Sequence, residues 1–289
     1  MIDVANTLRR AADLLACVSD TPRLDAEILL AHALGVERNV LLLDTARFAV
    51  PDGLVALIER RLAHEPIAYI IGYRDFWTVR IGVGPGVLVP RADSETLLAV
   101  AVQHFGDAAP RRILDLGTGP GTLLLAALDQ WPDATGLGID ASATALDFAR
   151  TNAAALGLAG RAELRAGDWA AGIDGQFDLI LCNPPYVRAD EALMPDVARY
   201  EPGAALFAGG DGLNDYRRLV PQLDGLLTPG GIAAVEIGWQ QAAAVTGLAV
   251  AAGLVAELHR DLGGRDRMLL LRAVGGDDNK SLGFGVKAV

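Results

Sequence analysis

An Asn-Pro-Pro-Tyr run is the stretch of this chain whose residue types most clearly suggest chemistry. Asn183, Pro184, Pro185 and Tyr186 directly follow an apolar segment, residues 177–182, which predicts a buried strand. Two prolines fix φ and remove two backbone donors, so the strand must end there. The Asn183 side-chain oxygen and the Pro184 carbonyl then form a rigid pair of acceptors with an aromatic ring close by. This arrangement suits a planar NH2 group, although most Asn-Pro pairs are simple turns.

A glycine-rich loop follows another predicted strand, residues 113–116. Such a loop lets the backbone approach a ligand closely at a helix N-terminus. It differs from a dinucleotide-binding fingerprint because Thr122 stands where the third glycine belongs. A carboxylate just before the glycines would repel a pyrophosphate and attract an ammonium group. The run is Asp115, Leu116, Gly117, Thr118, Gly119, Pro120 and Gly121.

Carboxylates end three successive predicted strands, at Asp115, Asp140 and Asp168. Asp140 has the position from which a carboxylate takes both hydroxyls of a ribose, and Asp168, with Trp169 beside it, is placed for an adenine. One such Asp is commonly a helix N-cap. Three in register, without a cationic phosphate clamp, favour S-adenosylmethionine over NAD, with S-adenosylhomocysteine as its product. The predicted cofactor-binding residues are Asp115, Gly117, Thr118, Gly119, Pro120, Gly121, Asp140, Asp168, Trp169 and Asn183.

Alternating strands and helices are needed to bring these residues to one edge of a sheet. The alternation predicts an α/β fold with a seven-stranded, mostly parallel, doubly wound sheet of the Rossmann-like class. Residues 254–259 and 268–272 predict a closing antiparallel pair. The predicted strands before that pair are residues 113–116, 136–140, 162–166, 177–183 and 231–237.

Changes of hydrophobic period predict the domain organisation. Residues 1–65 have apolar side chains at helical spacing and predict a small helical domain. Residues 66–90 change period and predict a linker β-hairpin, with short strands at 68–72, 76–79 and 87–89. The cofactor-dependent domain is expected over 91–274, and a poorly ordered tail over 275–289. The long acidic stretch 187–212 predicts either a lid or a surface loop.

The composition of the chain limits the classes of partner and ligand that it can bind. The 289-residue chain has a formal net charge of -11 and no Lys/Arg block, which argues against stable nucleic-acid binding. Two distant cysteines, Cys17 and Cys182, indicate a reducing compartment, and Cys182 is interpreted as a small core residue. No signal peptide or bilayer-spanning apolar run is visible, so we expect a cytoplasmic protein. The four histidines show no ligand spacing, so no metal is expected: His32, His64, His104 and His259.

The whole pattern resembles the PrmC/HemK family of release-factor glutamine N5-methyltransferases, over nearly the entire chain. Ala92 and Ser94 depart from the family's usual Pro and Thr, and Pro120 takes a usual Ser or Thr place, which affects local loop geometry. The matching segments are residues 66–69, 76–77, 90–95, 115–121, 140, 168–169, 183–186, 200–202, 238–241 and 261–267.

The resemblance implies methyl transfer to the side-chain amide nitrogen of the Gln in the Gly-Gly-Gln motif of class I peptide chain release factors. The N-terminal helices would hold that partner, and the enzyme would act as a monomer. Asn183 and Pro184 would accept the two N–H groups, and Tyr186 would pack on the flat amide. The residues expected to be catalytic are Asn183, Pro184, Pro185 and Tyr186.

Some alternatives remain open at this point. A ribosomal-protein glutamine methyltransferase would use the same residues, and an enzyme that methylates exocyclic amino groups of RNA or DNA shares the Asn-Pro-Pro-Tyr run. A nucleoside-binding module without activity is disfavoured by the intact run. Arg91 and Glu95 either shape the substrate pocket or serve as a structural ion pair or helix cap.

Overall fold

The computed structural model describes residues 3–274, which form two compact units. Of the described residues, the first unit comprises 3–74 together with Gly82–Val89 and Ala192–Gly203. The second comprises Asp75–Ile81, Pro90–Glu191 and residues 204–274. The domain boundaries predicted after residues 65 and 90 stay predictions, and the expected tail, 275–289, lies outside the described residues.

The first unit is built from short helices around an apolar core. Helix α1 begins after Asp3, whose side chain accepts the Ala5 N–H, and α2 begins with Pro22 and ends at the left-handed Gly35. Fully buried leucines pack these helices together: Leu8, Leu15, Leu29, Leu30 and Leu41. The helices are α1 (Val4–Leu15), α2 (Pro22–Leu34), α3 (Arg38–Leu43), α4 (Leu54–Leu62) and α5 (Ile67–Ile71).

The segment predicted as a linker hairpin contains a shorter hairpin than expected. Residues 68–72 were expected to form a strand and instead lie in α5, which ends at the left-handed Gly72. A short apolar run has no period that separates strand from helix, and the Pro66 carbonyl accepts two amide N–H groups that start a helical turn. The hairpin itself is β1 (Tyr73–Phe76) and β2 (Val79–Gly82), and the expected strand at 87–89 does not form.

The second unit contains the predicted seven-stranded sheet, with the order β5-β4-β3-β6-β7-β9-β8. The first five strands in that order are parallel, and β9 is antiparallel to both β7 and β8, which confirms the mostly parallel sheet and its closing antiparallel pair. The strands are β3 (Arg112–Leu116), β4 (Thr135–Asp140), β5 (Ala162–Ala166), β6 (Phe177–Cys182), β7 (Leu227–Glu236), β8 (Leu254–Arg260) and β9 (Asp266–Ala273).

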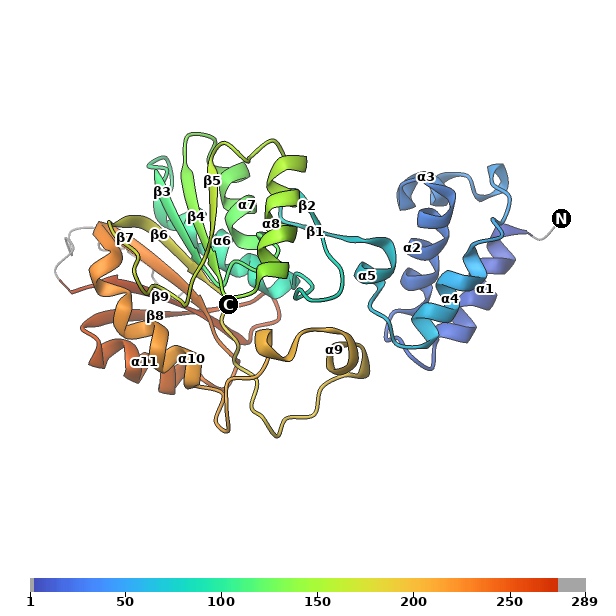
Figure 1. Ribbon diagram of the computed structural model, residues 1–289. Coiled ribbons are helices and arrows are strands. Elements are labelled where there is room, and N and C mark those ends of the chain that lie inside the picture. Colours follow the sequence, from blue (N-terminus) through green and yellow to red (C-terminus); the bar gives the residue numbers. More distant parts are fainter. Residues whose placement is uncertain (1–2, 275–289) are drawn as a thin grey trace, which may run out of the picture. The chain divides into compact units, whose positions relative to one another are not determined.

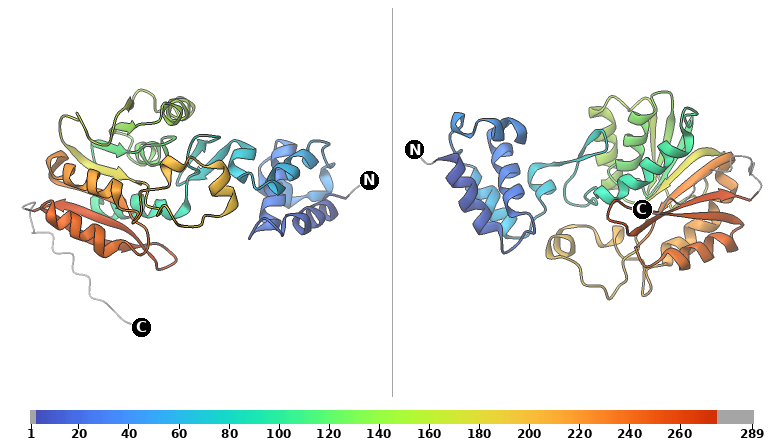
Figure 2. Two further views of the ribbon diagram at one scale, coloured as in Figure 1. Left: turned by 60° about the horizontal axis from the view of Figure 1, so that its bottom comes forward. Right: turned by 180° about the vertical axis from the view of Figure 1, so that it is seen from behind.

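Helices cover both faces of this sheet, as the ribbon views show (Figures 1 and 2). The chain order reverses between β3 and β6, the neighbouring central strands. In such folds ligands bind outside the carboxyl ends of the strands at the point of reversal. The helices are α6 (Glu95–Phe105), α7 (Thr122–Gln130), α8 (Ala143–Ala155), α10 (Asn214–Leu219) and α11 (Ala242–Ala251). None of the helices described within residues 3–274 has the length and apolar character needed to cross a membrane.

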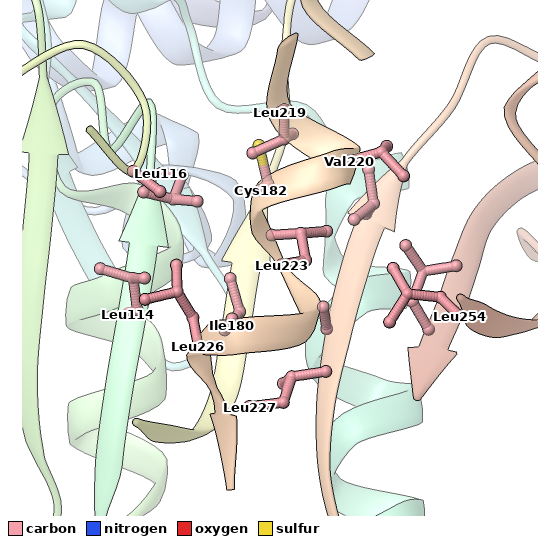
Figure 3. Close-up of a cluster of buried hydrophobic side chains, with 14 of the residues drawn as sticks. Leu114, Leu116, Ile180, Cys182, Leu219, Val220, Leu223, Leu226, Leu227 and Leu254 are labelled. Atoms are coloured by element: carbon pink, nitrogen blue, oxygen red, sulfur yellow. The ribbon is translucent and has the colours of Figure 1, made fainter. Parts of the chain in front are cut away.

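A buried apolar cluster supports the central strands from one face of the sheet. Leu114 of β3 and Ile180 of β6 belong to the same buried cluster as Leu223, which follows α10 (Figure 3). Cys182 is fully buried in the same cluster, and burial raises the pKa of its thiol. Since the thiolate is the reactive form of cysteine, Cys182 has the core role interpreted from the sequence.

The stretch predicted as a lid or surface loop, residues 187–212, has defined structure. It contains α9 (Pro195–Tyr200) and a short 3-10 helix, η3 (Gly203–Ala205). Inside the first unit, the Tyr200 hydroxyl donates to the Ala63 carbonyl over 3.0 Å, and the Val89 N–H donates to Glu201 over 3.1 Å. A helix of six residues is too short to give a periodic signal, so sequence reasoning missed it.

Candidate active site

The carboxyl ends of β3 and β6 bring the glycine loop and the Asn-Pro-Pro-Tyr turn next to each other. Leu116 at the end of β3 pairs with Cys182 at the end of β6, so Gly117 and Asn183 begin the two neighbouring loops. Gly117, Gly119 and Gly121 all have positive φ, between 57° and 87°. Residues with a Cβ rarely adopt that conformation, which explains why glycines recur at this spacing.

Asp115 provides a buried carboxylate beneath the glycine loop. Its Oδ2 accepts the Thr118 hydroxyl at 2.7 Å and the Leu124 N–H at 3.2 Å, whereas its Oδ1 is buried without a hydrogen-bond partner. Burial raises the pKa of Asp115 to about 7. An unpartnered buried oxygen is uncommon in proteins and fits a ligand that brings an N–H donor or a positive charge.

Asp140 is held at the end of β4 by two backbone donors. Its Oδ2 accepts the Gly119 N–H and its Oδ1 accepts the Ser142 N–H, both at 2.8 Å. Each carboxylate oxygen has two lone pairs, so both oxygens can still accept a hydroxyl. The side chain is half-buried beside the glycine loop, and its contact with a ribose stays a prediction.

Asp168 and Trp169 follow β5 and are placed differently from each other. Trp169 is half-buried with a φ of 50°, and a Cβ on Gly117 would lie 3.3 Å from its ring, so the indole stands beside the glycine loop. Asp168 is exposed, and Arg218 of α10 donates to both of its oxygens, with 2.6 Å to Oδ1. The roles predicted for both residues stay predictions, and an adenine contact by Asp168 must share this carboxylate with Arg218.

Asn183 belongs to a chain of hydrogen bonds at the ends of β6 and β7. Its Nδ2 donates to Ser94 Oγ over 3.1 Å, and the Ser94 hydroxyl donates to Glu236 Oε2 over 2.5 Å. The Tyr186 hydroxyl donates to the other Glu236 oxygen over 3.3 Å. Ser94 and Glu236 are buried, whereas Asn183 and Tyr186 are half-buried. Two predicted catalytic residues therefore converge on one buried carboxylate.

Glu236 is a buried residue of this site that sequence reasoning missed. Burial raises its pKa to about 7, against the opposing effects of the Ser94 hydrogen bond and the Arg267 charge. Burial and the nearby Glu236 also raise the pKa of Tyr186, so this phenol stays protonated. An acidic residue at the end of an otherwise apolar strand is the signal that could have found Glu236, since Asp115 was found in that way.

Gln241 fixes the exit from the Asn-Pro-Pro-Tyr turn. Its Nε2 donates to the Tyr186 carbonyl at 3.0 Å and to the Gly212 carbonyl at 3.1 Å, while its Oε1 accepts the Gly238 N–H at 3.0 Å. Gly212 has a φ of 72°, and a Cβ there would lie 2.4 Å from the Tyr186 carbonyl oxygen. One half-buried amide thus ties the turn to two other loops.

Glu95 and Arg91 occupy the approach to α6. Glu95 Oε1 accepts the backbone N–H of Trp77 over 3.0 Å, and Trp77 has a left-handed φ of 53° in the tight turn of the hairpin. This bond supports the structural alternative for Glu95. Arg91 lies close enough to Tyr186 for its charge to oppose the rise in the Tyr186 pKa. Both roles predicted for Arg91, shaping the substrate pocket and supporting the local structure, stay predictions.

Comparison with known proteins matches two segments of the chain to family models. Residues 6–72 match the PrmC N-terminal domain and residues 91–200 match the Methyltransferase small domain. A protein of Rhodospirillum rubrum is 45% identical over 259 residues, covering 88% of this chain and 79% of that protein. A protein of Caulobacter vibrioides is 42% identical over 258 residues, covering 87% and 89%. Both relatives are named release factor glutamine methyltransferase.

Solved structures show the same fold at low sequence identity. The hMettl16 catalytic domain in complex with the MAT2A 3'UTR hairpin 6 has a TM-score of 0.53 at 15% identity, covering 68% of this chain and 76% of that chain. The T. thermophilus 16S rRNA N2 G1207 methyltransferase in complex with AdoMet and guanosine has a TM-score of 0.51 at 18% identity, covering 70% and 49%. At these identities the likeness establishes the fold class alone, and it confirms the Rossmann-like methyltransferase architecture.

Proposed function

This chain belongs to the release factor glutamine methyltransferase family, and from that premise we propose how its residues carry out the reaction. The chain is a methyltransferase that uses S-adenosylmethionine and modifies a glutamine of a release factor. More specifically, we infer that it methylates the side-chain nitrogen of the Gln in the Gly-Gly-Gln motif of class I release factors. Two relatives that align over most of this chain support it.

The amide nitrogen of glutamine is a poor nucleophile because its lone pair is delocalised into the carbonyl. Asn183 Oδ1 and the Pro184 carbonyl accept its two N–H groups, which holds the nitrogen and directs it toward the methyl group. Tyr186 packs on the flat amide. The observation that carries this role is the hydrogen bond from Asn183 Nδ2 to Ser94, which leaves the Asn183 oxygen facing away from Ser94. Positioning and fixed dipoles of this kind lower barriers by several kcal/mol.

The carboxylates beside the glycine loop fit S-adenosylmethionine. The ammonium group of the methionine moiety would supply the donor that the buried Asp115 Oδ1 lacks, and Asp140, which retains lone pairs, would accept the ribose hydroxyls. Trp169 offers a ring face for the adenine beside the glycines that allow close approach. When bound, S-adenosylmethionine supplies a methyl group on a positively charged sulfur. The residues of this chain bind the donor and orient the acceptor.

The first unit is the part that we assign to the protein partner. Its match to the PrmC N-terminal domain and the net charge of -11 favour a protein over a nucleic acid as substrate. Since release factors act at the ribosome, the partner implies a cytoplasmic enzyme. The monomeric state and the lack of stable nucleic-acid binding are further parts of this proposal.

A transfer assay with labelled S-adenosylmethionine tests the proposed function. The acceptors are a class I release factor, its Gly-Gly-Gln variant with Gln→Ala, ribosomal protein and RNA, each offered separately. We expect label on the unaltered release factor alone. Label on RNA or ribosomal protein alone, or label that survives the Gln→Ala change, would contradict the proposal.

A further inference from the structure

Three segments that are distant in sequence meet behind the Asn183 side chain. The register of β6 and β7 pairs Cys182 with Val235, so Asn183 and Glu236 are the next residues at neighbouring strand ends. Ser94 lies in the short 3-10 helix η2 (Ala92–Ser94), directly before α6. The resulting hydrogen-bond chain runs from Asn183 Nδ2 to Ser94 Oγ and from the Ser94 hydroxyl to Glu236 Oε2.

The chemistry of these groups gives the hydrogen-bond chain a direction. An ionised carboxylate only accepts, so Ser94 must use its single proton on Glu236. Ser94 can then offer only lone pairs to Asn183, which must present its NH2 group to Ser94. The amide oxygen of Asn183 is thereby turned away from Ser94, and an amide in the opposite orientation would place two acceptors against each other.

We propose that Ser94 and Glu236 are positioning residues that set the orientation of the Asn183 amide and so present its oxygen to the NH2 group of the substrate glutamine. This inference rests on the proposed function, because it concerns how Asn183 grips that amide. Neither side chain is assigned contact with the substrate. Both act through Asn183. The rate of turnover then depends on which way the hydrogen bonds of the chain run, because that decides which end of the Asn183 amide faces the substrate.

The hydrogen bonds of this chain run in the opposite direction when Glu236 carries a proton. A protonated Glu236 donates to Ser94, Ser94 then donates to Asn183 Oδ1, and the Asn183 NH2 group turns toward the substrate NH2 group, where two donors oppose each other. The charged and titratable groups that face Glu236 are Arg267, Asp93 and Tyr186, and the Tyr216 hydroxyl donates to the Glu236 carbonyl.

Because burial holds the pKa of Glu236 at about 7, the two forms exchange within the range of ordinary assays. Glu236 is ionised above that pH, which favours the productive orientation. The rate of methyl transfer is therefore expected to rise with pH through about 7. Glu236→Gln imitates the reversed form at every pH, since the Gln oxygen accepts from Tyr186 and its NH2 group then donates to Ser94.

The test compares kcat, its pH profile and the Kd for S-adenosylmethionine in a small set of full-length variants. Ser94→Ala is expected to lower kcat about tenfold, and Ser94→Thr, which keeps a hydroxyl, should recover most of it. Glu236→Gln is expected to lower kcat about tenfold at pH 8.5 and to flatten the pH profile. The Kd should change by less than about twofold in all three variants.

Exposed residues provide matched controls for these substitutions. Thr151→Ala removes a hydroxyl that bonds to the Asp147 carbonyl on the surface, and Glu163→Gln neutralises an exposed carboxylate of β5. Both should keep the wild-type kcat and pH profile.

The outcomes separate this inference from the proposed function. If the unaltered enzyme transfers no label to the release factor, the proposed function fails. If it does, and Ser94→Ala and Glu236→Gln both keep the wild-type kcat and pH profile, the positioning role is overturned. Where Ser94→Ala does not fold, the isosteric Glu236→Gln variant decides through its pH profile, since a purely structural role would not flatten it.

Discussion

The two sides of the active site hold their polar groups by different means. On the cofactor side, backbone N–H groups of the neighbouring loops hold Asp140, and a backbone N–H with the adjacent Thr118 holds Asp115. On the acceptor side, side chains hold side chains, and the residues bonded to Ser94 lie 89 and 142 positions away. The cofactor side is thus encoded in short contiguous stretches, whereas the acceptor side depends on the assembled sheet. Substitutions on the two sides should therefore change different quantities.

The largest effect is expected from Asn183→Ala on the acceptor side. Removing one of the two acceptors for the glutamine NH2 group should slow transfer about a thousandfold, in the range seen when an enzyme loses a preorganised electrostatic contact. The Kd for S-adenosylmethionine should stay within about threefold. Single-turnover transfer and calorimetric titration measure the two quantities. A loss of cofactor affinity that matched the loss of rate would break the distinction between the sides.

Stability should respond to pH through Glu236. Its pKa rises from 4.5 to about 7 on folding, so its stabilising contribution is complete below pH 4.5 and is lost as pH rises through 7. The loss amounts to about 3 kcal/mol of unfolding free energy. Glu236→Gln should abolish this pH-dependent loss, because Gln does not ionise. The variant should therefore be more stable than the wild type at pH 8.5 and closer to it in stability at pH 5. Urea unfolding at both values measures this, and equal differences at the two pH values would refute it.

A smaller effect is expected from Asp115→Asn on the cofactor side. Because burial raises the Asp115 pKa to about 7, its carboxylate is ionised above that pH, and affinity for the cationic cofactor should increase as pH rises through it. The variant should bind S-adenosylmethionine roughly tenfold more weakly at pH 8.5, a difference of about 1.4 kcal/mol. Its Kd should depend little on pH. A variant that binds as tightly as the wild type would show that the unpartnered oxygen serves another purpose.

The smallest effect concerns the ion pair between Arg218 and Asp168. Freeing Asp168 by Arg218→Ala should tighten S-adenosylmethionine binding by about twofold if this carboxylate meets the adenine, because a surface ion pair costs little to break. Arg217→Ala is the matched control, since Arg217 lies on the same helix as Arg218 and forms an exposed ion pair with Asp211, which precedes that helix. Weaker binding in the Arg218 variant alone would assign the adenine contact to Arg218 instead.

The difference between the two sides also explains what the sequence could predict. Asp115, Asp140 and the glycine loop are recognisable because each lies at or just after the end of a predicted strand, and parallel strands place such ends at one edge of a sheet. The mostly parallel sheet with helices on both faces followed from the alternation of strands and helices, whereas the order of its strands was not predicted. Ser94 and Glu236 have no local signal that joins them, because only the register of β7 beside β6 brings them together.

Other misses have equally local causes. The run at α5 (Ile67–Ile71) has no hydrophobic period, and Gly72 can end either a strand or a helix. Helix α9 (Pro195–Tyr200) is held by a hydrogen bond from Tyr200 to the distant Ala63 rather than by its own pattern. The pairing of Asp168 with Arg218 could not be foreseen, since the two residues are 50 positions apart.

The position of the transferred methyl group tests the central claim most directly. Fragmentation mass spectrometry of a release factor treated with this enzyme and S-adenosylmethionine locates the group to one atom. The account predicts methylation of the side-chain nitrogen of the Gln in the Gly-Gly-Gln motif, and no methylation by the Asn183→Ala variant over the same time. A methyl group on another residue or on a backbone atom, or equal methylation by both proteins, would contradict it.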